Sequence, residues 1–382
     1  MTQRSIPAVY MRGGTSKGVF FRKEALPADP VARDRLLLRV IGSPDAYGKH
    51  IDGMGGATSS TSKVVLVAKS QREDSDVDFL FGAVAIGEPV IDWSGNCGNL
   101  TAAVGPFSIA QGLVAATEGT TTVRIWQANI GKRIVAHVPV ANGLPVEEGR
   151  FELDGVAFPG AEIRIEFIDP AGGSGLALLP TGHAIDRLDV PGIGPIEATL
   201  LNAGNPTIIV DAAALGLRGT EMQGDVNGDA ALLERLERVR ARGAVMMGLA
   251  ASDDEATRSR PATPKLAFVA APASYRASNG KAVAPEDIDV TTRILSMGLL
   301  HHALTGTGAI ALAVAGAVPG TLLHRLVAGR KQDSGDLRLG HPSGVLRVGA
   351  QTTERNGQWQ VSKAVVSRSA RRLMSGEVFV PE

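Results

Sequence analysis

The chain has 382 residues, of which 44% are hydrophobic, so it is long enough for one large domain or for two of ordinary size. Its 39 basic and 39 acidic residues balance without a long basic stripe, which argues against a nucleic-acid partner. A single cysteine excludes an internal disulfide framework and suits a reducing compartment such as the cytoplasm. We recognise no signal peptide, and Gly, Pro or charged residues interrupt every apolar segment before about 18 residues, so we expect no membrane span.

Most predicted elements are strands, rich in β-branched and aromatic residues and separated by Gly, Asn, Asp or Pro. They cover residues 9–12, 63–68, 77–86, 121–130, 132–140, 150–158, 161–167 and 207–210. Apolar positions at spacings of three and four predict amphipathic helices over 28–42 and 227–243. A third helix is expected over 285–304, because this segment begins with Pro and two acidic residues.

Two further segments, 97–114 and 305–323, are apolar nearly all round and rich in Ala, Gly and Val, as buried helices are. They lie about half a chain apart and each follows a turn, which indicates an internal duplication; chance similarity between two Ala-rich helices is the alternative. We therefore expect an α+β fold of two similar domains, each with strands around one buried helix. The Pro- and Gly-containing segment 180–195 is the candidate crossover, and 344–374 contains a strand–Asn-Gly–strand hairpin signal that can return the chain to the first domain. The expected domains are 1–182 with about 365–382, and 183–364.

The only cysteine, Cys97, stands between Gly-Asn pairs at the front of the first apolar helix. The free backbone N–H groups and the positive dipole end at this position would favour a thiolate and could also receive a carboxylate. Asn96 or Ser94 could cap the helix, and Gly95 and Gly98 would let a ligand approach the backbone. The alternative is a buried small hydrophobic residue, but Gly and Asn neighbours are poor core material.

A second polar, Gly-rich segment, IDGMGGATSSTSK, ends at Lys63, where small polar residues give way to a strand. A lysine partly desolvated among such groups can act as a base, whereas an ordinary solvated lysine is the alternative. The loop donors suited to an anion are Gly55, Gly56, Thr58, Ser59 and Ser60.

The segment YMRGGTSKGVFF near the start lacks the spacing of a phosphate loop, so it does not predict nucleotide binding. Its Arg12, Thr15, Ser16 and Lys17 instead resemble carboxylate-binding groups, with exposure on a turn as the alternative. The chain contains no GxSxG elbow, no HExxH motif and no paired His/Asp spacing, so we expect no metal.

Several blocks taken together resemble a known family. MRGGTSKGVFF, IDGMGGATSSTSK, DWSGNCGNLTAAVG, RIWQANIGK and GHPSGVLRVGA resemble, in this order, the 2-methylaconitate cis-trans isomerases of the methylcitrate pathway, across essentially the whole chain. That family is similar in fold to the diaminopimelate epimerase superfamily. The resemblance implies two pseudo-equivalent domains, each a β-barrel around a central helix, with the site in the cleft between them.

In that superfamily two cysteines act as opposed acid and base, each in a turn that heads a central helix. Cys97 takes the position of the first, whereas LTGTGA has Thr305 at the position of the second. A hydroxyl is far too weak an acid–base group to replace a thiol, so we reject two-cysteine racemisation of amino acids. The resemblance to the isomerases implies Lys63 as the partner of Cys97. Lys63 is the expected principal base, and the exchanged assignment stays open.

The resemblance also implies residues that bind substrate. The superfamily's GNP turn is matched by NAGNPT, which gives Asn205, and its acidic–basic pair falls on Ser296 and Met297, which suits a substrate without an amino group. Arg260, in RSRPATPK, is a further candidate partner for a carboxylate. For these positions turn chemistry or capping is the alternative. The other predicted substrate-binding residues are Arg12, Ser16, Ser60, Asn96, Gly98, Asn99, Thr305 and Gly306.

The implied activity is cofactor-independent conversion between 2-methyl-trans-aconitate and 2-methyl-cis-aconitate in propionate catabolism. The alternatives are a tautomerase or double-bond-shifting isomerase on a related acid such as 4-oxalomesaconate, and a non-catalytic accessory protein of an aconitase-like dehydratase. The expected partners are a tricarboxylate substrate, an aconitase-like 2-methylcitrate dehydratase as a functional partner, and a second copy in a homodimer.

Overall fold

The computed structural model divides the chain into two compact units. It describes residues 3–171, 175–329 and 336–381. The first unit comprises Met1–Ile165 and Ser367–Glu382, and the second comprises Glu166–Val366. The chain passes from the first unit to the second within β9 (Ile163–Ile168) and returns within β20 (Gln358–Arg368). The return at Ser367 lies close to the expected limit of about 365, whereas the first passage follows Ile165 rather than residue 182, because it lies inside a strand and not in a linker that composition could mark.

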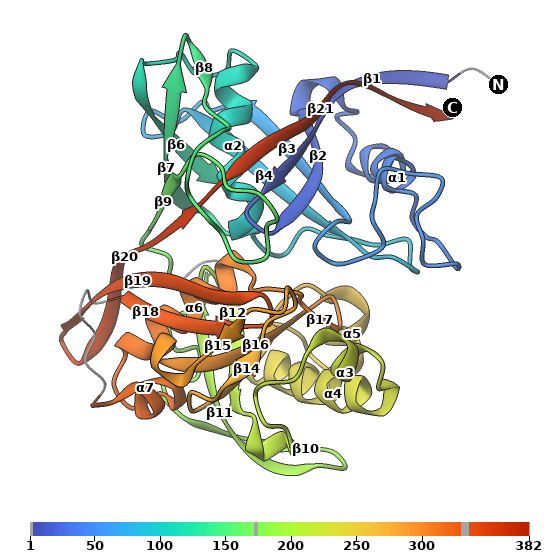
Figure 1. Ribbon diagram of the computed structural model, residues 1–382. Coiled ribbons are helices and arrows are strands. Elements are labelled where there is room, and N and C mark those ends of the chain that lie inside the picture. The colour runs from blue at the N-terminus through green and yellow to red at the C-terminus, as the bar shows by residue number, and fades with distance from the viewer. Residues whose placement is uncertain (1–2, 172–174, 330–335, 382) are drawn as a thin grey trace. The chain divides into compact units, whose positions relative to one another are not determined.

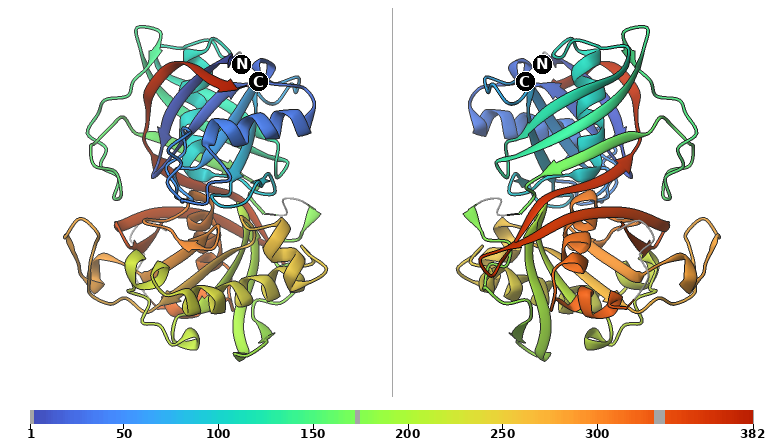
Figure 2. Two further views of the ribbon diagram at one scale, coloured as in Figure 1. Left: turned by 90° about the vertical axis from the view of Figure 1, so that its right-hand side faces the viewer. Right: turned by 90° about the vertical axis from the view of Figure 1, so that its left-hand side faces the viewer.

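In the first unit a curved sheet surrounds a single helix, α2 (Figures 1 and 2). Its strands are β1 (Gln3–Gly13), β2 (Ser16–Arg22), β3 (Lys63–Lys69), β4 (Val77–Val84), β5 (Ile91–Asp92), β6 (Gly119–Gln127), β7 (Lys132–Ala141), β8 (Leu144–Pro145) and β21 (Ala370–Pro381), and its helices are α1 (Pro30–Ile41) and α2 (Gly98–Ala110). β1 and β2 form an antiparallel hairpin, β2 runs parallel to β3, and β3 is antiparallel to β4. The last strand, β21, returns antiparallel to β1.

The second unit also places one helix, α6, against its sheet (Figure 1). Its strands are β10 (Asp186–Val190), β11 (Gly194–Ala203), β12 (Asn205–Asp211), β13 (Lys265–Ala270), β14 (Tyr275–Arg276), β15 (Ala282–Val283), β16 (Val290–Ser296), β17 (Leu299–Leu300), β18 (Asp336–His341) and β19 (Gly344–Arg355). Its helices are α3 (Gln223–Asn227), α4 (Ala230–Met246), α5 (Asp253–Ser259), α6 (Gly306–Ala317) and α7 (Leu322–Val327).

The predicted duplication is confirmed by the strand pairing. The run β11, β12, β13, β16, β17, β18, β19 repeats the pairings of β1, β2, β3, β4, β5, β6, β7. Each run has an antiparallel hairpin, a parallel third strand, an antiparallel fourth, and then one antiparallel and one parallel partner of that fourth strand. In each unit the buried helix follows the short strand of this run. The architecture is therefore α+β with two pseudo-equivalent units.

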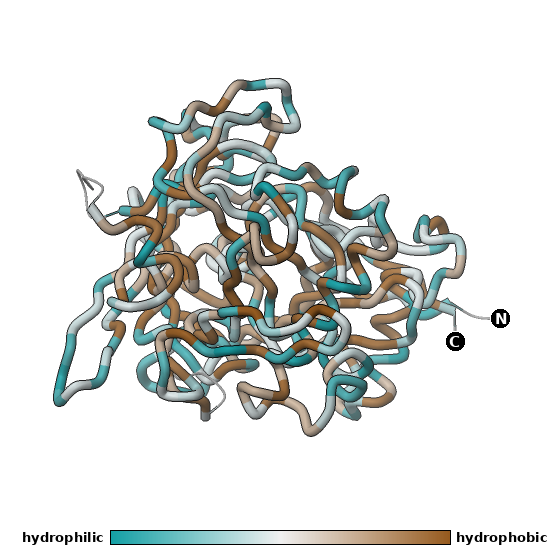
Figure 3. Tube along the Cα trace, turned by 90° about the horizontal axis from the view of Figure 1, so that it is seen from below, coloured by the Kyte–Doolittle hydropathy of each residue, from teal (hydrophilic) through white to brown (hydrophobic). Residues whose placement is uncertain are grey.

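The small residues of α2 and α6 let these helices lie close to their sheets. A Cβ atom on Gly105 of α2 would lie 2.6 Å from Cγ2 of Val138 on β7, so even alanine would not fit there without a shift. By contrast, α1 and α4 are amphipathic and cover the outside of their units, and Asp29 and Asp229 cap them by accepting backbone N–H bonds. Hydrophobic segments gather in the interior of the trace, whereas the outlying loops contain many hydrophilic residues (Figure 3).

Some predicted elements were wrong. The helix expected over 285–304 is instead the 3₁₀ turn Pro285–Asp287 followed by β16 and β17. The Pro and the two acidic residues do begin a turn, but every residue of Val290–Ser296 is buried, and a strand buried on both faces lacks the alternation that identifies strands. The strand expected over 150–158 is reduced to one bridge, because Gly155 adopts φ +94° in a turn. The candidate crossover 180–195 contains β10 and its turn into β11, within the second unit.

None of the described helices combines the length and the apolar character that a membrane crossing requires.

Candidate active site

Lys63 and Cys97, the two residues predicted to carry the chemistry, are in contact within the first unit. Lys63 is the first residue of β3 and is 5% exposed. Its Nζ donates to Sγ of Cys97 at 3.4 Å and to Oγ of Ser16 at 3.0 Å. The parallel pairing of β2 with β3 places Gly18 opposite this lysine, where a Cβ would lie 2.8 Å from the Lys63 carbonyl oxygen. Glycine at this position therefore leaves the room that Lys63 occupies.

Cys97 is the N-cap residue of α2. Its backbone is extended, and its Sγ accepts a hydrogen bond from the Leu100 N–H at 3.5 Å. The sulfur itself thus takes the capping role that the sequence assigned to Asn96 or Ser94. Because a helix N-terminus carries a partial positive charge, this position favours a negatively charged sulfur.

The contact between these two groups supports proton transfer. An amine and a thiol can each hold or release a proton, so one can accept a proton from a bound carbon acid while the other supplies one. Both residues are buried, Cys97 at 7% exposure, and electrostatic interactions are stronger in such surroundings than in water. Gly98 and Asn99 begin the same helix end, whose backbone N–H groups can receive a carboxylate oxygen.

Ser60, Asn96 and Asn99 also lie in this part of the first unit, and all three are buried. The carbonyl oxygen of Ser60 accepts a hydrogen bond from the backbone of β2, which fixes the turn that precedes Lys63. The Asn96 side chain accepts a hydrogen bond from Thr101 at 3.5 Å. The structure therefore places Asn96 and Asn99 at the start of α2 and Ser60 in the turn that precedes Lys63.

Arg12 is held by the backbone instead. Its Nη1 donates to the carbonyl oxygens of Gly14 at 3.0 Å and Ser369 at 2.9 Å, so it fastens the β1–β2 turn to the returning strand. Burial lowers the pKa of Arg12, and the positive charge of Arg371 adds to that effect, while Glu147 opposes it. Neither of these two Arg12 hydrogen bonds reaches Lys63 or Cys97.

The remaining predicted residues belong to the second unit. Thr305 is the N-cap residue of α6, and its Oγ1 accepts from the Gly308 N–H at 3.2 Å, as the Cys97 sulfur does in α2. Asn205 begins β12 and donates to Thr307 at 3.1 Å. Gly306 is the first residue of α6, Ser296 ends β16, and Met297 follows it in a turn with φ +55°. Arg260 is the C-cap residue that follows α5, and it donates to Thr263 at 3.2 Å.

The structure adds Lys265, which sequence reasoning missed. Lys265 begins β13, which runs parallel to β12 as β3 runs parallel to β2, and its Nζ donates to Oγ of Ser296 at 3.0 Å. It is 7% exposed and occupies the position in the second unit that Lys63 occupies in the first. Aligning the two halves would have found it, since TSKVVLVA at 61–68 is repeated as TPKLAFVA at 263–270.

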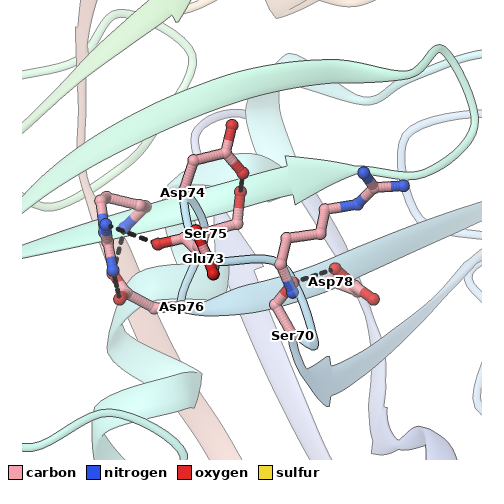
Figure 4. Close-up of polar contacts among 8 residues, drawn as sticks. Ser70, Glu73, Asp74, Ser75, Asp76 and Asp78 are labelled. Atoms are coloured by element: carbon pink, nitrogen blue, oxygen red, sulfur yellow. Dashed lines mark hydrogen bonds and ion pairs between the residues drawn. The ribbon is translucent and has the colours of Figure 1, made fainter.

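Another polar region of the first unit is a hollow of about 680 Å³ beside the β3–β4 turn. Several of its polar side chains form hydrogen bonds or ion pairs with neighbouring side chains (Figure 4). Ser70 donates to Asp78 at 2.7 Å, and Asp76 pairs with Arg124 at 2.7 Å. Throughout the described ranges, no group of His, Cys, Asp and Glu side chains is arranged to hold a metal ion.

Known proteins similar to this chain are isomerases. The profile of a family described as PrpF protein matches residues 3–381. A 2-methyl-aconitate isomerase of Shewanella oneidensis is 57% identical over 100% of this chain and 98% of its own length, and one of Cupriavidus necator is 55% identical over 99% and 98%. A 4-oxalomesaconate tautomerase of Pseudomonas putida is 38% identical over 100% of this chain and 97% of its own length.

Solved structures agree with the fold. The crystal structure of a methylitaconate-delta-isomerase matches with a TM-score of 0.77 at 38% identity, over 100% of this chain and 96% of that one. A probable proline racemase from Agrobacterium radiobacter matches with a TM-score of 0.56 at 15% identity, over 98% and 92% of the two chains, which supports the two-unit fold alone.

Proposed function

The chain belongs to the PrpF protein family, and from this premise we propose that it is an isomerase that interconverts 2-methyl-trans-aconitate and 2-methyl-cis-aconitate. The observation that carries the proposal is the Lys63–Cys97 contact at 3.4 Å beside the N-terminus of a buried helix. The pair supplies an acid and a base from the chain itself, so the proposed reaction requires no cofactor.

The chemistry has to weaken a double bond before it can rotate. Removing a proton from the CH₂ group next to a carboxylate gives an anion delocalised through the alkene, and the former double bond then turns. Returning a proton to the same carbon fixes the other geometry. Such a carbon acid is weak, so the stabilisation of the developing negative charge has to supply much of the rate enhancement.

The first unit offers the groups that each step needs. In the proposed mechanism Lys63 takes the proton and Cys97 acts as its acid–base partner, because the two side chains already share a hydrogen bond. The N–H groups of Gly98 and Asn99 receive a carboxylate oxygen at the positive end of α2. In the second unit, Thr305 and Gly306 begin the equivalent helix, and the buried Lys265 begins the equivalent strand.

The test is proton NMR of the purified protein with 2-methyl-trans-aconitate in deuterated water. We expect the cis isomer to form with deuterium on the methylene carbon and with the alkene between the same two carbons. Loss of activity in both Lys63→Ala and Cys97→Ala is the second expected result. If both variants keep full activity, the catalytic proposal fails, and a non-catalytic role beside an aconitase-like dehydratase gains support.

A second candidate is a double-bond-shifting isomerase or tautomerase on a related acid. It is favoured by the names of the 4-oxalomesaconate tautomerase and of the methylitaconate-delta-isomerase, both similar over nearly the whole chain. The same anion would form, but the proton would return to another carbon of the delocalised system. In the NMR experiment this outcome places deuterium on that other carbon and moves the alkene.

The setting of the reaction follows from the same proposal. A cytoplasmic location suits the single free cysteine, because thiols stay reduced there. An aconitase-like 2-methylcitrate dehydratase is the expected functional partner in propionate catabolism, since the two enzymes would share 2-methylaconitate, and a homodimer is the proposed assembly.

A further inference from the structure

Arg368 is a buried arginine close to the candidate acid–base pair, and no sequence motif singled it out. It ends β20, where the chain returns to the first unit, and it is 1% exposed. Its Nε donates to Oδ1 of Asn99 at 3.0 Å, and its Nη1 donates to the Ser367 carbonyl oxygen at 3.0 Å. The C-terminal segment therefore brings a permanent cation to the first turn of α2.

The Asn99 side chain is fixed at both ends. Its Oδ1 accepts from Arg368, and its Nδ2 donates to Oγ1 of Thr15 at 3.0 Å. Because a guanidinium can only donate hydrogen bonds, it determines which way the amide points. Asn99 follows the N-cap Cys97 by two residues, so this chain of contacts anchors the helix turn that carries the sulfur.

The β1–β2 turn is shaped around these groups. Gly14 adopts φ +50°, and a Cβ there would lie 2.6 Å from Oδ1 of Asn99 and 3.0 Å from Cδ of Arg368. A Cβ on Gly13 would lie 2.7 Å from the Asn99 carbonyl oxygen. The two glycines of the MRGGTSK segment thus allow the turn to close over the start of α2 and over the arginine.

The negative charge that acts on the Arg368 guanidinium comes from Cys97. Among the described residues no carboxylate forms an ion pair with it, although a buried cation is costly without a negative partner. Burial lowers the pKa of Arg368 to about 10, and the negative charge of Cys97 acts in the opposite direction. Because an interaction between two charges is reciprocal, a thiolate that favours the guanidinium is itself favoured by it.

Other groups act on the sulfur as well. The Lys63 ammonium approaches it from β3 at 3.4 Å, and the Leu100 N–H of α2 donates to it at 3.5 Å. The acidic residue nearest to Cys97 in the sequence is Asp92 on β5, whose carboxylate accepts a hydrogen bond from the backbone N–H of Ser94 at 2.7 Å. Arg368 keeps its proton near neutral pH, so its charge stays constant while the pair exchanges protons.

We propose that Arg368 is a positioning residue for the acid–base pair: it fixes the first turn of α2 through Asn99 and stabilises the anionic form of Cys97. Its constant positive charge offsets the negative charge that Cys97 acquires when it gives up a proton.

Thiolate formation tests the charge directly. The ultraviolet absorbance of the thiolate is followed against pH in the full chain, with Cys97→Ala subtracted, and it reports on one sulfur because the chain has one cysteine. Arg368→Gln keeps a donor for Asn99 but loses the positive charge. The titration curve of this variant is expected to shift to higher pH, so that the same thiolate fraction is reached at an about tenfold lower proton concentration. Arg368→Lys keeps the charge and is expected to stay within about threefold of the wild type. The control is Arg372→Gln, which changes a side chain that is 48% exposed on β21. Its titration curve should superimpose on the wild-type curve.

A curve for Arg368→Gln that superimposes on the wild type overturns the assignment of charge. If that variant does not fold, as judged by circular dichroism, Arg368→Lys decides: a shift as large as tenfold contradicts the proposal, and a curve near the wild type supports it. The positioning role rests on the proposed function. Because one ammonium cannot reproduce the two fixed bonds of the guanidinium to Asn99 and to the Ser367 carbonyl oxygen, we expect kcat of Arg368→Lys to fall at least tenfold while KM changes less. Full turnover in that variant contradicts it. The titration needs no substrate, so a failure of the proposed function leaves it intact.

Discussion

Replacing Lys63 separates its role as a base from its role as a cation. Lys63→Met removes both, whereas Lys63→Arg keeps the charge but cannot give up a proton near neutral pH. If Lys63 is charged while Cys97 is a thiolate, their 3.4 Å contact is worth about 5 kcal/mol at an effective dielectric constant of about 20. General-base catalysis contributes roughly 10²- to 10⁴-fold, or about 3–5 kcal/mol in the activation barrier. We therefore expect both variants to lose turnover by about a thousandfold.

The assay is isomerisation followed by NMR, together with deuterium exchange at the methylene carbon of substrate. Both variants should lose exchange as well as isomerisation, because the first proton transfer fails. The matched control is Lys69→Met, an exposed lysine at the opposite end of the same strand, which should retain activity within about twofold. If Lys63→Arg exchanges deuterium within tenfold of the wild type, Lys63 acts only through its charge, and the base has to be Cys97.

Three further outcomes are expected. Lys265→Met should lower the melting temperature, since the buried Ser296 hydroxyl loses the hydrogen bond that Lys265 donates at 3.0 Å; an unchanged melting temperature contradicts this. Gly14→Ala should lower the melting temperature and the activity, because φ is +50° and the new Cβ meets Asn99, whereas Gly48→Ala, at φ +61° with open space around it, should show only the smaller backbone cost of about 1 kcal/mol. Hydrogen bonds from three backbone N–H groups hold the pKa of Asp45 below 3.8, so the stability that its carboxylate provides is present above this pH and is lost below it. Asp45→Asn should therefore melt at a lower temperature than the wild type near neutral pH, and the gap should close as the pH falls below 3.8. A gap that is independent of pH contradicts this account.

Local sequence patterns predicted much of the fold. The Gly- and Ala-rich segments became α2 and α6 because a helix without a polar face can only be stable in a core. The Asn356-Gly357 turn joins β19 to β20 as the hairpin signal predicts. The segment 285–304 failed because burial on both faces removes the period of two, and Pro285 opened a short turn instead of a helix.

The site residues, like the elements of the fold, were predicted only in part. Motifs in consecutive residues predicted Lys63 and Cys97, but the contact between them depends on how β3 and α2 pack, which no local pattern encodes. Arg368 was missed for a related reason: it lies 269 positions from Asn99 along the chain, in a segment whose only visible signal was its return to the first domain. Lys265 was missed although the signal was present, since its TPK repeats TSK only when the halves are aligned.

The duplication also explains why one chain can retain a shared scaffold and yet abandon symmetric chemistry. Both units begin a parallel strand with a buried lysine, Lys63 or Lys265, and both cap the central helix with the side chain of its N-cap residue. In the first unit the capping atom is the sulfur of Cys97, which can release and regain a proton. In the second unit it is the hydroxyl oxygen of Thr305, and an aliphatic hydroxyl does not release its proton near neutral pH. The first unit can therefore exchange protons with a carbon acid, while the second offers hydrogen bonds and positive charge alone. Racemisation of an amino acid requires an acid and a base on opposite faces of one carbon. A tricarboxylate that gives up and regains a proton at one methylene needs only a single acid–base centre, and the first unit by itself contains such a pair.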